Sequence, residues 1–233
     1  PAENMTRLFK LAAKAQRGLV HLTRRRDLLR PWFEPEYRNL LVWVGLRGMV
    51  SGLWSVYFVV YLYEARHWST FSVLLTGTVL GIAGLGTALG AGRLADKINY
   101  PAAFLWLSLL WVAGGIAAGL ALDTGWGMAL ALLLIWDGTG SLPGMATVIL
   151  ESAAAARLAA IEKTACYIAG FNLVSMLSRS LGVLAADPIL RSLSTLEQPY
   201  DFIGFFRISL LATLLLPLWA WHWRRAAGGR GQS

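Results

Sequence analysis

Four polar side chains interrupt long apolar stretches of this sequence: Arg47, Asp137, Asn172 and Arg179. Charged groups inside a bilayer are costly, so they usually face a water-filled cavity or a partner. If the four line one cavity, Arg47 or Arg179 would bind an anionic group on a solute, and Asp137 would carry a coupling proton. The alternative is a structural ion pair, Asp137 with Arg47 or Arg179, which would hold helices together and transport nothing.

A cluster of helix-weakening residues follows Asp137. Gly140, Pro143 and Gly144 lie within one predicted helix, and proline removes a backbone hydrogen bond. We therefore expect this helix to bend at these residues. Interrupted helices beside an intramembrane carboxylate often mark transporter sites. The alternative is that glycine and proline are simply common in transmembrane helices.

The composition requires a membrane to hold these residues. Of the 233 residues, 56% are hydrophobic and only 15% are charged, and the mean hydropathy is +0.54. About 20 consecutive apolar residues span a bilayer core. We predict an all-α polytopic membrane protein with six transmembrane helices. Their expected ranges are Leu40–Tyr63, Phe71–Arg93, Pro101–Leu122, Gly127–Leu150, Thr164–Ala186 and Phe202–Trp223.

The basic residues predict the orientation of the bundle. If both termini are cytoplasmic, sixteen Lys and Arg residues lie inside, two lie outside and three lie within spans. Such a bias follows the positive-inside rule. We therefore expect a multi-pass protein of a bacterial-type inner membrane. The net charge of +8 then reflects topology and lipid contact, and nucleic acid is not an expected partner.

The two ends of the chain are predicted to lie outside the bundle. Residues 1–38 form a basic segment in which apolar residues recur every three or four positions, typical of an amphipathic helix on anionic lipid headgroups. Residues 39–223 form the transmembrane bundle. Residues 224–233 are expected to be a flexible basic tail.

The end of the second predicted span carries Gly92, Asp96 and Lys97. At this spacing the chain resembles the major facilitator superfamily, whose loop between the second and third helices has a glycine, an aspartate four residues later and then a basic residue. The resemblance implies that this loop helps to latch one conformation. Ile98, Asn99 and Tyr100 depart from the second half of the motif.

The glycine-rich stretch from Asp137 to Ala186 resembles the fourth and fifth helices of the same superfamily, with Glu151 as the acidic residue at the cytoplasmic end. A complete member has twelve helices in two halves. The resemblance therefore implies half of a secondary transporter, for example a split or truncated second half. Such a half would move a small solute by alternating access after pairing with another six-helix half.

A second function stays open: a non-transporting structural or assembly subunit of a larger membrane complex. Glycines four residues apart in the second span, Gly77 with Gly81 and Gly86 with Gly90, would then form a close contact, either within the bundle or with a partner. The three histidines are far apart and Cys166 is the single cysteine. We therefore expect no metal site, no cofactor and no enzymatic activity.

Overall fold

The computed structural model describes residues 34–95, 97, 99–136, 141–159, 164–194 and 200–228. These residues form seven helices and no strand. The chain divides into two compact units, Pro1–Asn39 and Leu40–Ser233, and the second contains all seven of these helices except the start of the first. The predicted amphipathic helix of the first 33 residues lies outside the described residues.

Five of the helices are long and apolar enough to cross a membrane. They are α3 (Pro35–Glu64), α4 (Thr70–Ala95), α5 (Tyr100–Leu120), α8 (Thr164–Leu193) and α9 (Phe202–Gly228). These helices confirm the all-α class, are compatible with a multi-pass membrane protein and match five of the six predicted spans. α9 includes Arg224 and Arg225, so the predicted end of the last span at Trp223 is too early.

The fourth predicted span is not one continuous helix. It consists of α6 (Gly125–Ile135) and α7 (Leu142–Leu158), and the expected range Gly127–Leu150 is therefore wrong. Ser141 caps α7 by accepting a hydrogen bond from the Gly144 N–H, and Pro143 lies in the first turn. Proline is tolerated there because the first-turn N–H groups have no helical partner.

α8 also differs from its predicted range. It continues past Ala186 to Leu193 and contains Pro188, and an exposed Arg191–Asp187 ion pair joins the Nε and Oδ2 atoms at 2.9 Å in its last turns. At 1.5 Å per residue, the 30-residue helix is about 45 Å long. Because a hydrocarbon core is about 30 Å thick, the helix is long enough to extend beyond it.

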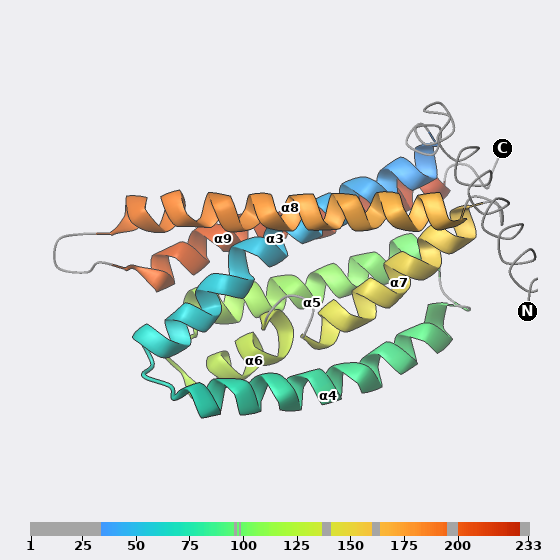
Figure 1. Cartoon of the computed structure of the whole chain (residues 1–233). Coiled ribbons are helices and arrows are strands. Elements are labelled where there is room, and N and C mark those ends of the chain that lie inside the picture. Colours follow the sequence, from blue (N-terminus) through green and yellow to red (C-terminus); the bar gives the residue numbers. More distant parts are fainter. Residues whose placement is uncertain are drawn as a thin grey trace, which may run out of the picture. The chain divides into compact units, whose positions relative to one another are not determined.

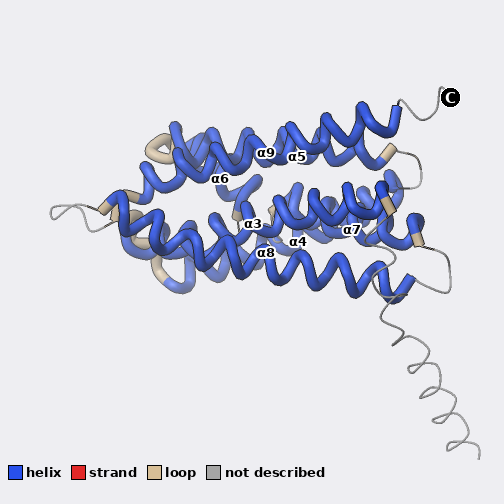
Figure 2. The backbone as a smooth tube through the Cα atoms, turned by 90° about the horizontal axis from the view of Figure 1, so that it is seen from above, coloured by secondary structure: helices blue, strands red, loops and turns tan. Residues whose placement is uncertain are grey.

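The helices of the second unit alternate in direction along the chain (Figure 1). α6 and α7 together make one passage between the end where α5 finishes and the end where α8 begins. α5 packs mainly along α9, and α4 packs mainly along α7 (Figure 2). α6 and α7 together therefore occupy the position of the fourth predicted span.

Aromatic rings fill the interior between α3 and α9. Phe206 lies against Trp54, Phe58 and Tyr61, with ring centroids 5.3, 5.8 and 5.8 Å apart. At the other end of the helices, Trp43 and Trp223 both stack on Phe104, with centroids 5.0 and 5.5 Å away. Such burial of large rings is a major source of packing energy.

Two tryptophans near the ends of apolar stretches are core residues. Trp43 has an exposed fraction of 0% and Trp223 of 2%. Their place near the end of an apolar stretch suited either role, because interface belts and cores both favour tryptophan. Only the packing on Phe104 distinguishes the two roles.

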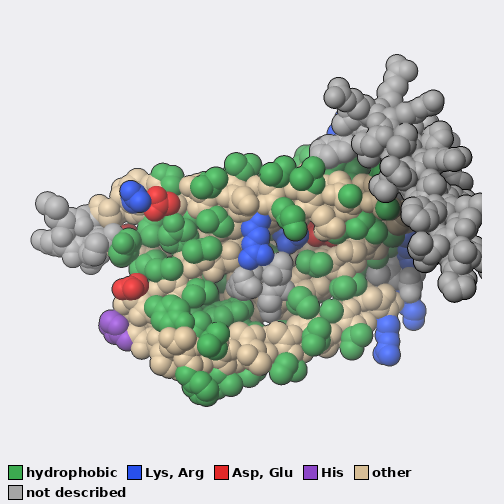
Figure 3. Space-filling model, in the orientation of Figure 1, with side chains coloured by type: hydrophobic (Ala, Val, Ile, Leu, Met, Phe, Trp, Pro, Cys, Tyr) green, Lys and Arg blue, Asp and Glu red, His purple; other side chains and the backbone are tan. Residues whose placement is uncertain are grey.

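α4 and α8 are the least covered helices among the five long ones. Only 17% of the apolar stretch of α4 and 11% of that of α8 is buried, against 67% for α3. Hydrophobic side chains cover the face in Figure 3 along its length, and Lys or Arg side chains lie in its middle as well as at both ends. A surface of this kind requires contact with lipid or with another protein.

Candidate functional site

The strongest polar feature of the described residues is an ion pair in the interior of the bundle. Arg47 on α3 donates from Nε to Oε1 of Glu151 at 2.7 Å and from Nη2 to Oε2 at 3.0 Å. Trp43 Nε1 also donates to Oε1, at 2.9 Å. The two-pronged geometry matches the planar guanidinium to the carboxylate.

This network joins three helices, and its two charged side chains are closed to solvent. Arg47 Nη2 lies 3.1 Å from Ser175 Oγ and donates to it, so the pair on α3 and α7 is also tied to α8. The Arg47 side chain is 3% exposed and that of Glu151 is 0%. Removing one partner would leave a buried charge, which typically costs about 3–5 kcal/mol.

The network lies in the half of the bundle that contains the starts of α3 and α8. Glu151 is seven residues before the end of α7, a rise of about 10 Å, and Ser175 is eleven residues after the start of α8, about 16 Å. At these depths both residues are well inside the ends of their helices.

Close backbone contact between α3 and α8 brings the network together. A side chain at Gly52 would overlap the Arg179 carbonyl, and one at Gly182 would overlap the Met49 carbonyl. At Gly48 it would overlap the Ser178 hydroxyl. Small residues allow such close crossings between membrane helices, and this one lets the Arg47 side chain reach Ser175.

The structure describes three of the four predicted cavity residues, and they differ in burial. Arg47 is buried in the ion pair, whereas Asn172 is exposed on α8 and Arg179 is half-buried. Asn172 and Arg179 are seven residues apart and share one face of α8. Asp137 lies outside the described residues. Asn172 is thus exposed while Arg47 is buried in this bundle, and a polar cavity that the two residues share stays a prediction.

The carboxylate that pairs with Arg47 is Glu151, the residue that follows the predicted end of the fourth span at Leu150. That predicted end is wrong because α7 continues to Leu158. The signal was present in the sequence: Ala153–Ala156 is a run of the strongest helix-forming residue. An apolar stretch followed by such a run predicts a helix that continues past Glu151, so that Glu151 lies within the helix and not at its end.

Four of the six predicted latch and bend residues are described by the structure. A side chain at Gly92 would meet nothing within 4 Å, and Lys97 is exposed, while Asp96 lies outside the described residues. A latch contact is therefore not seen at the two that are described. Gly140 is likewise outside the described residues. Pro143 and Gly144 begin α7, so they start a new helix rather than bend a continuous one.

Three of the four paired glycines of α4 make no close contact within the bundle. A side chain at Gly77 would meet Trp136, at 3.3 Å from Cζ2, but nothing lies within 4 Å of one at Gly81, Gly86 or Gly90. Of these four glycines, only Gly77 therefore packs inside the bundle.

The hydrogen bonds of Arg47 can hold α3, α7 and α8 in fixed positions relative to one another. Any movement that separates α3 from α7 would break the Arg47–Glu151 pair. Within the described ranges, no group of three His, Cys, Asp or Glu side chains is placed to hold a metal ion. Comparison with known proteins finds no matching family model, no matching curated protein and no matching solved structure.

Proposed function

We propose that this chain is half of a secondary transporter, which moves a small solute by alternating access after pairing with a second six-helix half. The observation that carries the proposal is Asn172, a polar side chain exposed on a helix long and apolar enough to span a membrane. It lies eight residues into α8, about 12 Å along a helix of about 45 Å. A polar amide facing hydrocarbon is unfavourable, so this face needs water or a partner.

Further residues of α8 extend this polar face. Arg179 follows on the same side about 22 Å along the helix, and Ser180 is exposed beside it. A second half placed over α8 would enclose a polar passage between the two bundles. Such a passage is where transporters bind their solutes, at the interface of two repeats near the bilayer midplane.

The interrupted fourth passage supports the same proposal. Trp136 follows α6 and Ser141 precedes α7, and neither residue has helical backbone angles. Non-helical backbone at membrane depth is tolerated only where protein or water surrounds it. The Arg47–Glu151 pair would then hold α7 to α3 in one state of the cycle. Movement of α7 away from α3 would require this pair to open.

The closed geometry of that pair favours a second candidate. Arg47 and Glu151 bind each other in two places and are sealed from solvent, which suits a rigid structural or assembly subunit of a larger membrane complex. In that case the exposed faces of α4 and α8 would be covered by dry protein contacts.

Water accessibility at Asn172 distinguishes the two candidates. In a Cys166→Ser background, Asn172→Cys would be treated in native membranes with a membrane-impermeant thiol reagent. Leu109→Cys is the matched control, because Leu109 is 43% exposed on α5 and lies about 13 Å from the start of that helix. The transporter predicts rapid labelling of Asn172→Cys and none of Leu109→Cys.

Equal lack of reaction at the two positions would contradict the transporter. If Asn172→Cys also resists a lipid-soluble thiol reagent while Leu109→Cys reacts with it, the face is a dry protein contact and the subunit is favoured.

A further inference from the structure

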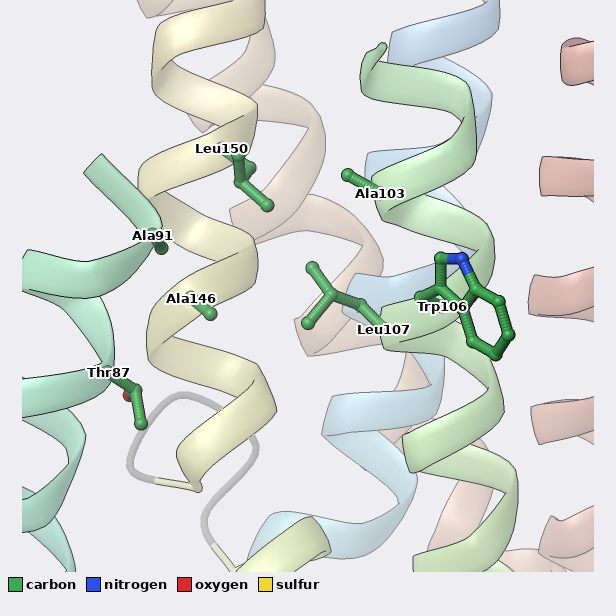
Figure 4. A pocket seen from close by; sticks show the side chains of 7 residues that line it. All are labelled: Thr87, Ala91, Ala103, Trp106, Leu107, Ala146 and Leu150. Atoms are coloured by element: carbon green, nitrogen blue, oxygen red, sulfur yellow. The ribbon is translucent and has the colours of Figure 1, made fainter. Parts of the chain in front are cut away.

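A pocket of about 470 Å³ opens on the side of the bundle. Its lining comes from three helices: Thr87 and Ala91 of α4, Ala103 and Leu107 of α5, and Ala146 and Leu150 of α7. Figure 4 shows Leu107 and Leu150 pointing into the space between α5 and α7. Trp106 also lines the pocket and is 69% exposed, so the pocket reaches the outer surface.

The pocket offers hydrocarbon contact and little else. Apart from the indole of the exposed Trp106, Thr87 is the one lining residue with a polar side chain. Its hydroxyl lies 2.8 Å from the Gly84 carbonyl oxygen and 3.2 Å from that of Leu142, so the hydroxyl hydrogen is used within the protein. Pockets for polar solutes carry a few well-placed polar groups. A flexible apolar chain suits this pocket better.

Basic residues lie at the end of the bundle closest to this pocket. Arg93 is two residues beyond Ala91, and Lys97 follows in the loop that leads to α5. Arg157 is seven residues beyond Leu150, about 10 Å, and its guanidinium carbon lies 5.3 Å from the centre of the Tyr100 ring. All three basic residues are exposed.

The order of these features matches an anionic phospholipid in the membrane. The positive-inside rule assigns this end to the cytoplasm, and the cytoplasmic leaflet is where anionic lipids attract basic residues. A lipid lying against the bundle would have its phosphate at the level of the basic residues and its acyl chains one or two helical turns deeper. The pocket lies at that deeper level.

We propose that the pocket between α4, α5 and α7 binds an acyl chain of an anionic phospholipid whose phosphate is held by Arg93, Lys97 and Arg157. The site is separate from the exposed face of α8 and does not depend on the proposed function. It would make the positions of α4 and α7 sensitive to the lipid composition of the membrane.

Native mass spectrometry of the purified chain tests this, with phosphatidylglycerol and phosphatidylcholine added in turn. The first variant is Arg93→Gln with Lys97→Gln, which removes two phosphate contacts. The second is Ala146→Leu, which fills the pocket without changing charge. The control is Arg224→Gln with Arg225→Gln, which removes two exposed cations from the same end of the bundle, on α9.

We expect phosphatidylglycerol to bind more tightly than phosphatidylcholine. Each basic residue near the surface contributes about 1 kcal/mol to anionic lipid binding, so the first variant should weaken phosphatidylglycerol binding by about tenfold or more. Ala146→Leu should also weaken it, while the α9 control should change it little. The charge variant leaves the pocket intact, so it decides the question if Ala146→Leu fails to fold.

Three results would overturn the proposal: equal binding of the two lipids, an equal loss of binding in the α9 control, or a folded Ala146→Leu variant that binds phosphatidylglycerol as the parent does.

Discussion

At the residue scale, the buried carboxylate of Glu151 joins α7 to α3. Its carboxylate accepts one hydrogen bond from Trp43 and two from Arg47, and Arg47 donates a further one to Ser175. Both carboxylate oxygens therefore have a protein partner although the pair is buried. This matters because a partly satisfied buried charge costs more than an apolar core.

Breaking the pair from one side is predicted to destabilise the bundle more than removing it altogether. Arg47→Leu or Glu151→Leu should each lower the free energy of unfolding by about 3–5 kcal/mol, because each leaves a buried charge without its partner. The double variant should recover a large part of that loss. Thermal unfolding of the purified protein in mild detergent measures all three.

This set of single and double variants has a matched control in the exposed Arg191–Asp187 pair of α8. Removing either side of it should change stability by no more than about 0.5 kcal/mol, since exposed pairs of this spacing contribute little. Additive single effects at Arg47 and Glu151 would contradict the account of the buried pair.

The sequence could predict that Arg47 needs a partner, but not which one. The need follows from its place in an apolar stretch. The choice of Glu151 depends on where α7 ends and on how it faces α3, and neither can be read from the residues near Arg47. Trp43 and Ser175 carried even less signal, because tryptophan and serine have ordinary roles throughout membrane helices.

At the element scale, the close crossing of α3 and α8 sets the distance between Arg47 and Ser175. Gly52 and Gly182 face each other, and a side chain on either one would come about 3 Å from the Cα atom of the other. Any side chain there would push the helices apart. The crossing therefore couples helix spacing to the hydrogen bond between Arg47 and Ser175.

Substitution at Gly52 is predicted to damage the fold where the same change on α4 does not. Gly52→Ala places a methyl group on the Arg179 carbonyl and should destabilise by about 1–3 kcal/mol, the usual cost of overpacking. Gly81→Ala is the matched control, because nothing lies within 4 Å of its methyl group. Thermal unfolding of both variants, with and without a second change of Arg47→Leu, reports whether crossing and ion pair are coupled.

If Gly52→Ala is as stable as Gly81→Ala, the close crossing does not hold the bundle. Glycine spacing alone could not have separated the two positions. Both lie in small-xxx-small patterns, Gly48 with Gly52 and Gly77 with Gly81. Which pattern meets another helix depends on how each helix is rotated about its axis, and this depends on the packing of the whole bundle.

Helix ranges also show which features the local sequence determines and which depend on packing. Five apolar stretches predicted α3, α4, α5, α8 and α9 well, because crossing a membrane needs a minimum number of apolar residues. The break between α6 and α7 was expected only as a bend. Ser141 followed by Pro143 is a helix-start pattern that was available in the sequence, and it identifies the beginning of α7.

At the scale of the whole bundle, the helices differ in how much of their surface is exposed. α3 is mostly buried, whereas α4 and α8 expose apolar side chains, open glycines and the amide of Asn172. Lipid covers apolar side chains well but does not satisfy an amide. The proposal of a second half depends on this combination of apolar and polar groups on the exposed face of α8. The buried ion pair does not support it.

The most direct test is site-specific photo-crosslinking in native membranes. A photoreactive amino acid in place of Met176, which is 72% exposed on α8, is predicted to crosslink to a second six-helix half, identified by mass spectrometry of the adduct. The same amino acid in place of Leu109 on α5 should react with lipid. If the Met176 position reacts with lipid alone, as the Leu109 position does, the second half is absent and the central claim is contradicted.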